Sequence, residues 1–98
     1  MTRDEAASEL ALCADALRAR GAQAAYLFGS TARDEASDGS DVDVFIDVVP
    51  GRKFSLIDLA GMRSYLVEQL GVEIDLTTRK GLHPKLRAQI EGEAIKIF

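Results

Sequence analysis

Hydrophobic and polar residues follow two different periods along this chain, and the first is helical. Apolar residues recur every three or four positions from Ala6 to Leu17, the spacing of an α-helix with one buried face. Thr2 and Glu5 fit a capping box at the start of this helix, and Gly21 suits its end. The pattern therefore predicts one continuous N-terminal helix that ends at Gly21.

Further helical segments are expected later in the chain. Ser55 is a suitable N-cap and Gly71 a suitable C-cap for a long helix between them. Its expected inner face consists of Leu56, Leu59, Ala60, Leu66, Val67 and Leu70. A short helix is expected from Ser30 to about Ala36, and a last helix is expected to begin at Pro84, because proline suits the first helical position.

Other segments alternate with a period of two, which is typical of β-strands. The predicted strands cover residues 23–28, 41–48, 72–77 and 94–98. Turn-forming residues separate the first three of them at positions 37–40 and 50–53. Helices and strands thus alternate along the chain, which predicts an α/β fold with a small β-sheet flanked by helices.

Composition and charge narrow the possible functional classes. With 98 residues, the chain is expected to form a single domain over positions 1–98. Its net charge of −4 disfavours broad nucleic-acid binding, which relies on a basic face. A single cysteine, Cys13, excludes an internal disulfide and a cysteine-based zinc site. No apolar run approaches the roughly 20 residues that span a membrane, so no membrane association is expected and the cytoplasm is the expected location.

Acidic and basic residues gather in different parts of the chain. Acidic residues crowd the stretch from Asp34 to Asp47, and a basic cluster lies further along, at Arg79, Lys80, Lys85 and Arg87. A basic cluster beside an acidic metal site suits a polyphosphate or an RNA end. A solvated helix flank explains the same residues equally well, so both interpretations remain open.

Two carboxylates in the predicted strand 41–48 indicate a metal site. Asp41 and Asp43 are two positions apart, so they point to the same face, while valine and isoleucine side chains occupy the other. Aspartate is a poor strand former and like charges repel, so a divalent cation over this face would explain the pair. Magnesium uses few protein carboxylates and completes its shell with water and phosphates. Asp75, on the polar face of the next predicted strand, is the candidate third ligand.

A possible phosphate cradle precedes these carboxylates. Gly29 lets the backbone approach a phosphate closely, and a helix starting at Ser30 directs free N–H groups towards an anion. The hydroxyl of Ser30 adds a donor, and Arg33 lies one turn further along the same helix. Each feature alone has a plainer explanation, as a common turn or as solvated charges. Together they indicate phosphoryl or nucleotidyl transfer.

The spacing of these residues resembles a known family signature. Gly29-Ser30, ten further residues and then Asp41-Val42-Asp43 resemble the Gly-Ser-x10-Asp-x-Asp signature of the DNA polymerase β nucleotidyltransferase superfamily, and of its minimal nucleotidyltransferases in particular. The segment 72–76 is similar to the strand that carries the third carboxylate in that group. One departure is Thr31, which stands where many members of the group have arginine.

The resemblance implies a fold, a reaction and a set of roles. It implies a nucleotidyltransferase fold with a mixed sheet, two Mg²⁺ ions and ATP as the substrate. By position, Asp41, Asp43 and Asp75 would be catalytic metal ligands. Gly29 and Ser30 would contact the triphosphate. Many relatives of this size are antitoxins that silence a HEPN-family RNase toxin by transferring AMP to one of its side chains, so a toxin protein is the expected partner and acceptor.

Other functions remain open from the sequence. The chain could be a non-catalytic antitoxin that acts by binding alone. It could also transfer a nucleotide to a small molecule such as an aminoglycoside, or to an RNA end. A phospho-acceptor domain of the response-regulator type also clusters aspartates, but the Gly-Ser pair ahead of the carboxylates and the missing downstream lysine and threonine pattern disfavour it.

Overall fold

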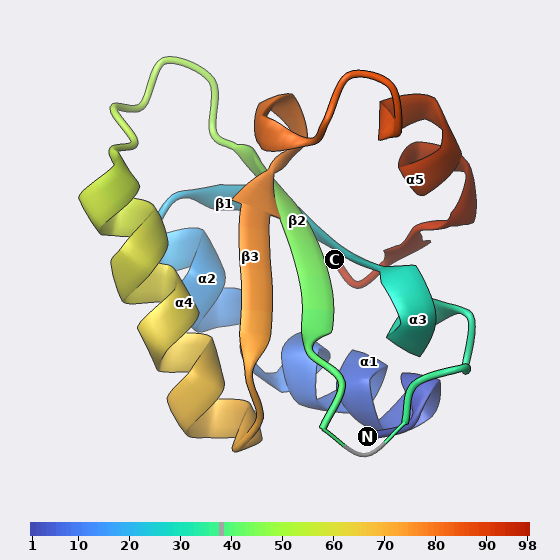
Figure 1. Cartoon of the computed structure of the whole chain (residues 1–98). Helices are drawn as coiled ribbons and strands as arrows, with labels where there is room; N and C mark the ends of the chain where they lie inside the picture. Colours follow the sequence, from blue (N-terminus) through green and yellow to red (C-terminus); the bar gives the residue numbers. More distant parts are fainter. Residues whose placement is uncertain (38) are drawn as a thin grey trace.

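The computed structural model describes residues 1–37 and 39–98 (Figure 1). The elements are α1 (Arg3–Leu12), α2 (Ala14–Ala19), β1 (Ala22–Phe28), α3 (Gly29–Ala32), β2 (Val42–Val48), α4 (Leu56–Leu70), β3 (Ile74–Thr78), the 3₁₀ turn η1 (Arg79–Gly81), α5 (Arg87–Glu93) and β4 (Ile95–Lys96). In the described part of the chain, no helix combines the length and the apolar character needed to cross a membrane.

The strands form one mixed sheet in the order β3-β2-β1-β4. β1 is antiparallel to both β2 and β4, whereas β3 runs parallel to β2. A parallel pair needs a long crossover, and α4 provides it between β2 and β3. The predicted α/β fold with a small mixed sheet flanked by helices is therefore confirmed.

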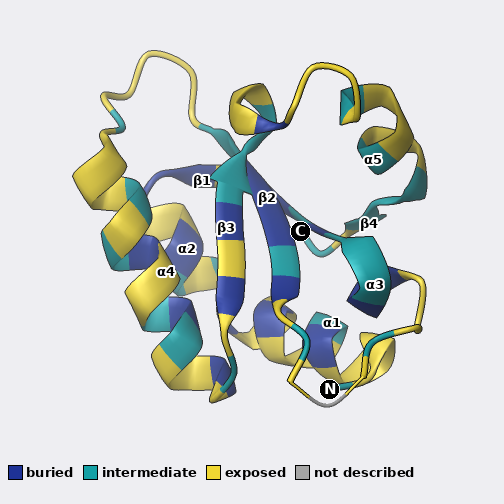
Figure 2. Ribbon diagram, in the orientation of Figure 1, coloured by how far each residue is buried: buried dark blue, intermediate teal, exposed yellow. Residues whose placement is uncertain are grey.

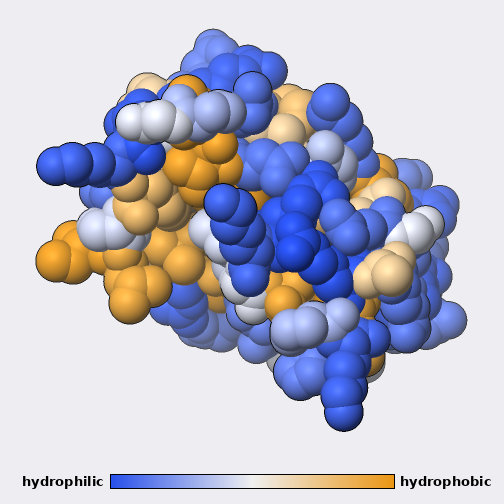
Figure 3. Space-filling view, turned by 90° about the horizontal axis from the view of Figure 1, so that it is seen from above, coloured by the Kyte–Doolittle hydropathy of each residue, from blue (hydrophilic) through white to orange (hydrophobic). Residues whose placement is uncertain are grey.

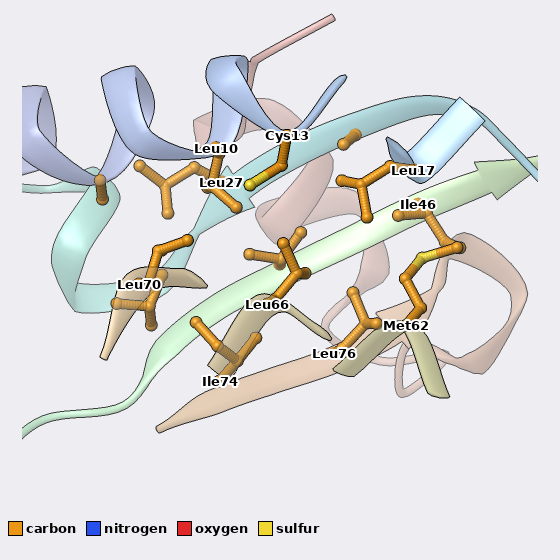
Figure 4. Close-up of a cluster of buried hydrophobic side chains, with 14 of the residues drawn as sticks. Leu10, Cys13, Leu17, Leu27, Ile46, Met62, Leu66, Leu70, Ile74 and Leu76 are labelled. Carbon is orange, nitrogen blue, oxygen red and sulfur yellow. The ribbon is translucent and has the colours of Figure 1, made fainter. Parts of the chain in front are cut away.

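The hydrophobic core lies between one face of this sheet and the helices α1, α2 and α4 (Figure 4). Leu10 and Leu17 from the first two helices and Leu66 from α4 are completely buried. They meet the inward side chains of the strands, including Val44 and Ile46, which the alternation had placed on this face. Figure 2 shows the same alternation on β3, where buried positions flank an exposed one.

The opposite face of the sheet is aromatic as well as acidic. Phe45 lies on this face between two aspartates and is only 1% exposed. Its ring packs edge-on against Tyr26, with centroids 4.6 Å apart, and lies 5.7 Å from the ring of Phe28. The guanidinium group of Arg79 lies 4.9 Å from the centroid of Phe45. This face therefore has an apolar floor beneath its charged groups.

The N-terminal helix differs from the predicted one because it is divided at Cys13. The amide of Cys13 donates to the carbonyl of Leu10 at 3.0 Å, an i to i+3 bond that tightens the turn and separates α1 from α2. The capping box of Thr2 and Glu5 is present as predicted. Cys13 itself is buried and contributes to the core.

The predicted inner face of α4 was partly wrong. Leu66 and Leu70 are buried, as expected, but Leu56 is 84% exposed and Ala60 also faces solvent. Met62 takes the inward position instead. The helix keeps its predicted caps, since the Ser55 side chain accepts from the Asp58 amide and Gly71 is left-handed.

Several predicted boundaries also move. The short helix ends at Ala32 and not near residue 36, because Asp34 adopts a left-handed φ of 58°. The carboxylate of Asp34 instead accepts a hydrogen bond from the Arg3 amide at 3.2 Å.

The last helix begins at Arg87, since the residues after Pro84 form a turn first. Three strands start late: β2 at residue 42, β3 at 74 and β4 at 95. Position 38 of the predicted turn 37–40 lies outside the described residues.

Candidate active site

The parallel pairing of β2 and β3 brings two of the predicted carboxylates together. Asp43 and Asp75 are direct partners in the register of the two strands. The amide of Val42 donates to the carbonyl of Glu73 at 3.0 Å, which fixes this register at its first residues. Asp41 was predicted to lie within this strand. It is exposed and lies immediately before β2.

The environment of Asp43 shows that the three carboxylates influence one another. The pKa of Asp43 is raised from 3.8 to about 6, first because the side chain is partly buried. The negative charges of Asp75 and then Asp41 raise it further, as does the contact with the carboxyl of Asp75. Arg33 acts in the opposite direction. All three acidic side chains therefore act on one small region of the sheet.

Gly29 places the polypeptide backbone directly against this region. Phe28 pairs with Asp43 across β1 and β2, so the next residue lies beside the carboxylate. Gly29 has a φ of +73°, and a Cβ atom there would lie only 2.1 Å from Oδ2 of Asp43. A side chain is thus excluded both by backbone conformation and by space. The sequence prediction that a glycine is needed here for close approach has a structural basis, although the nearest group is a carboxylate.

The sequence predicted Ser30 as the first residue of the short helix and as its cap. That prediction was wrong, because the helix α3 begins one residue earlier, at Gly29. Phe28 is the N-cap, and no side chain caps the helix. The amides of the first turn therefore have no side-chain acceptor, which suits an anion. Ser30 is partly exposed next to them. Thr31 is 1% exposed, and its Oγ1 has no hydrogen-bond partner among the described residues.

Arg33 is close to the site but engaged with carboxylates of its own. Its Nε donates to Glu35 at 3.1 Å, and its Nη1 donates to Glu93 of α5 at 3.0 Å. To contact a phosphate, the guanidinium group has to exchange at least one of these partners. Both the arginine and Glu35 are exposed, so the exchange costs little.

The donor chemistry of the site fits magnesium as a partial ligand set. Within residues 1–37 and 39–98, no group of three or more histidine, cysteine, aspartate or glutamate side chains is arranged to hold a metal ion unaided. However, the negative charge of the adjacent Asp75 raises the pKa of Asp43, and a cation beside the pair would offset that repulsion. Magnesium commonly takes one or two carboxylates and leaves its remaining positions to water and phosphate.

Sequence reasoning missed the residues that border this site. Phe45 was not recognised as buried, although its position two residues after Asp43 places it on the same face. Asp47 was noted only as the end of the acidic stretch, yet it binds Arg79 through two hydrogen bonds of 2.7 and 3.0 Å. The aromatic residues at alternating positions of β1 were the available signal, because they need a partner on the polar face.

Asp43 is expected to make the metal-free protein less stable as the pH rises. Its folded pKa of about 6 exceeds the ordinary 3.8, so the folded state binds this proton more tightly than the unfolded state. The contribution of Asp43 to the free energy of unfolding is therefore highest below pH 3.8, declines between pH 3.8 and about pH 6, and is lowest above that range. Asp43→Asn is expected to remove this decline and to raise the free energy of unfolding at neutral pH by about 1–2 kcal/mol, after allowance for solvent screening.

Urea unfolding of both proteins in EDTA, from about pH 4 to about pH 8, measures this effect. Asp15→Asn is the matched control, since it removes the same charge from an exposed helix position. An equal decline of stability with pH in the wild type and Asp43→Asn would contradict the assignment.

Comparison with known proteins places this site in a family. The family described as "Nucleotidyltransferase domain" matches residues 10–97. A candidate protein adenylyltransferase of Methanocaldococcus jannaschii is 37% identical over 78 residues, which cover 80% of this chain and 82% of the relative. The protein adenylyltransferase MntA of Thermococcus cleftensis is 30% identical over 100 residues, covering 99% of this chain and 97% of the relative.

Solved structures agree with this assignment. A candidate minimal nucleotidyltransferase has a TM-score of 0.74 and 36% identity, with coverage of 97% of this chain and 95% of that chain. A chain from the crystal structure of a toxin–antitoxin with AMP-PNP has a TM-score of 0.72 at 18% identity, covering 100% of this chain and 73% of that chain, and shows the shared fold. The family match spans most of the sequence, and the predicted enzyme class is thereby confirmed. This chain belongs to the nucleotidyltransferase domain family.

Proposed function

We propose that this protein transfers AMP from ATP to a hydroxyl group of a partner protein in a magnesium-dependent reaction. The observation that carries the proposal is the adjacency of Asp43 and Asp75 on paired strands, with the backbone of Gly29 against them. A protein acceptor is supported by the names of the relatives, which describe protein adenylyltransferases.

The metal ligands would be Asp41, Asp43 and Asp75. Bound magnesium would offset the charge of the triphosphate and favour deprotonation of the attacking hydroxyl. The raised pKa of Asp43 supports this role, since Asp75 and Asp41 both act on its carboxyl and a nearby cation would favour its charged form.

The remaining residues would bind and orient the substrate. Gly29 would contact the triphosphate through its backbone, and the Ser30 hydroxyl would donate to a phosphate oxygen. Arg33 would exchange Glu35 for a phosphate. Asp75 is exposed and can receive the proton of the incoming hydroxyl. A bond forms between the acceptor oxygen and the α-phosphorus, the bond to the bridging oxygen breaks, and pyrophosphate leaves.

The partner would be a toxin of the HEPN family, encountered in the cytoplasm. This assignment follows from the resemblance of the Gly-Ser and Asp-x-Asp motifs to minimal nucleotidyltransferases that act as antitoxins. The net charge of −4 makes a nucleic-acid acceptor less suitable.

The test is adenylate transfer to the protein that co-purifies with this chain. With ATP and Mg²⁺, intact-mass spectrometry is expected to show the partner heavier by one or more adenylates. EDTA is expected to prevent the change, and GTP in place of ATP tests the nucleotide preference. An unmodified partner after incubation with active, metal-loaded protein would refute the proposal.

A second candidate is an antitoxin that acts by binding alone. It is favoured by one observation: the guanidinium group of Arg33 is engaged by Glu35 and Glu93 and is not free for a phosphate. The double variant Asp41→Asn/Asp43→Asn separates the two candidates. If it still neutralises the toxin fully in cells, binding is sufficient; if neutralisation is lost while the complex still forms, transfer is required.

A further inference from the structure

A cavity lies at the far end of the strands from the carboxylates. Its volume is about 500 Å³, and it lies between the ends of β2 and β3, the loop that follows β2, and the start of α5. Asp47 is in its wall, four residues along β2 from Asp43, a separation of about 13 Å. The volume falls within the range of roughly 300–1,000 Å³ typical of small-molecule sites.

The wall of this cavity is strongly basic. It contains Arg52, Arg79, Lys80 and Arg87, against the single carboxylate of Asp47. Glu91 of α5 also pairs with two of these cations, so four positive charges face two negative ones in a chain whose net charge is −4. Among the described residues, Arg52 and Lys80 take part in no ion pair. Gathered like charges repel one another, and an anion between them would remove that cost.

The side chain of Arg79 in the cavity wall is held in place by several neighbouring groups. Asp47 accepts two hydrogen bonds from its guanidinium group, at 2.7 and 3.0 Å, and the group lies 4.9 Å from the ring centroids of Tyr26 and Phe45. Glu91 of α5 contacts the same guanidinium group and lies 3.8 Å from Nε of Arg87. Arg79 is therefore held by the protein itself, and Arg52 donates a hydrogen bond to the carbonyl of Ala19 at 3.1 Å. Arg87 has only the 3.8 Å contact with Glu91, so Lys80 and Arg87 are the cations available to a ligand.

The other side of the cavity is apolar. Val49, Pro50 and Phe54 contribute to it from the segment between β2 and α4. Figure 3 looks down on this end of the molecule, where hydrophilic side chains gather in the middle and apolar side chains lie beside them. The combination of a basic wall and an apolar wall suits a ligand with one anionic and one apolar part.

We propose that this cavity is a second ligand site, which binds a small phosphate-bearing molecule with its phosphate on Lys80 and Arg87. Guanidinium and ammonium groups are strong donors to phosphate oxygens, and arginine matches them in a bidentate manner. Phe54 and Pro50 contact the rest of the molecule. This site is separate from the place of the triphosphate at Gly29 and Ser30, and it does not depend on the proposed reaction.

Inorganic pyrophosphate is the probe, and nuclear magnetic resonance is the measurement. Titration of the isotope-labelled full chain in EDTA is expected to shift the backbone amides of residues 49–54 and 78–81 in a saturable manner. The amides of residues 29–33 are expected to move less. Lys80→Gln/Arg87→Gln is expected to weaken binding by at least about tenfold, because it removes two charge-assisted contacts. The spectrum of each variant also shows whether it is folded.

The double variant Arg3→Gln/Lys96→Gln is the matched control, since it removes one arginine and one lysine that do not line the cavity. It is expected to bind the probe within about twofold of the wild type, because long-range surface charge is screened. Glu91→Gln is expected to tighten binding, since it frees Arg87 from a competing carboxylate. Equal weakening in both double variants, shifts confined to residues 29–33, or no saturable shift would each overturn the proposal.

Discussion

Asp43→Asn is expected to lower the rate of adenylate transfer by at least about a thousandfold while the protein stays folded. Charge stabilisation by a bound metal contributes several kcal/mol to a transfer reaction, and each 1.4 kcal/mol is about tenfold in rate. Asparagine has nearly the same size but no charge, so it keeps the register of β2 and β3 and weakens the hold on a cation. The measurement is the initial rate of partner adenylation at saturating ATP.

Two comparisons make this result specific to the charge. Asp15→Asn removes the same charge from an exposed position on α2 and is expected to retain the full rate. Complex formation with the partner is expected to be unchanged in Asp43→Asn, which separates lost chemistry from lost binding. A rate within about tenfold of the wild type would show that Asp43 does not hold the catalytic metal.

Gly29→Ala is expected to damage activity and stability together. The new Cβ would lie 2.1 Å from Oδ2 of Asp43, so the carboxylate or the start of α3 must move. A displacement of about 1 Å in a catalytic group can lower the rate by about a hundredfold. The left-handed φ of +73° adds a further cost of about 1–2 kcal/mol to folding. Chemical unfolding and the transfer assay measure the two effects.

Gly71→Ala is the matched control for this substitution. Gly71 has a φ of +71°, almost the same as that of Gly29, but a Cβ there would meet nothing within 4 Å. It is expected to lose about 1–2 kcal/mol of stability and to keep its activity. The difference between the two variants therefore measures the clash with Asp43. Equal activity in both would show that the site tolerates a side chain at position 29.

The pairing of the carboxylates was accessible from the sequence because alternation fixes which way a strand residue points. Val42, Val44 and Ile46 had to face the core, which left Asp43 on the opposite face. The same rule placed Asp75 opposite the buried Ile74 and Leu76. Register between the two strands was not in the pattern, but the family resemblance implied that the carboxylates would meet.

The features that the sequence did not predict depend on contacts between distant segments. The left-handed conformation of Asp34 is supported by a hydrogen bond from the Arg3 amide, and periodicity carries no information about such a bond. Leu56 satisfies the helical spacing, yet it is the first residue of α4 and remains exposed. One of the two interpretations of the basic cluster placed it beside the carboxylates, whereas its arginines line a cavity at the other end of β2.

The parallel register of β2 and β3 makes the site depend on tertiary structure and not on either strand alone. Asp43 and Asp75 become neighbours only when the whole crossover through α4 has docked, and such non-local pairing is intrinsically slow. A nascent or partly unfolded chain consequently contains both aspartates but does not hold them next to each other. Adenylate transfer would therefore require complete folding. Incompletely folded molecules would have no activity, and not merely a reduced one.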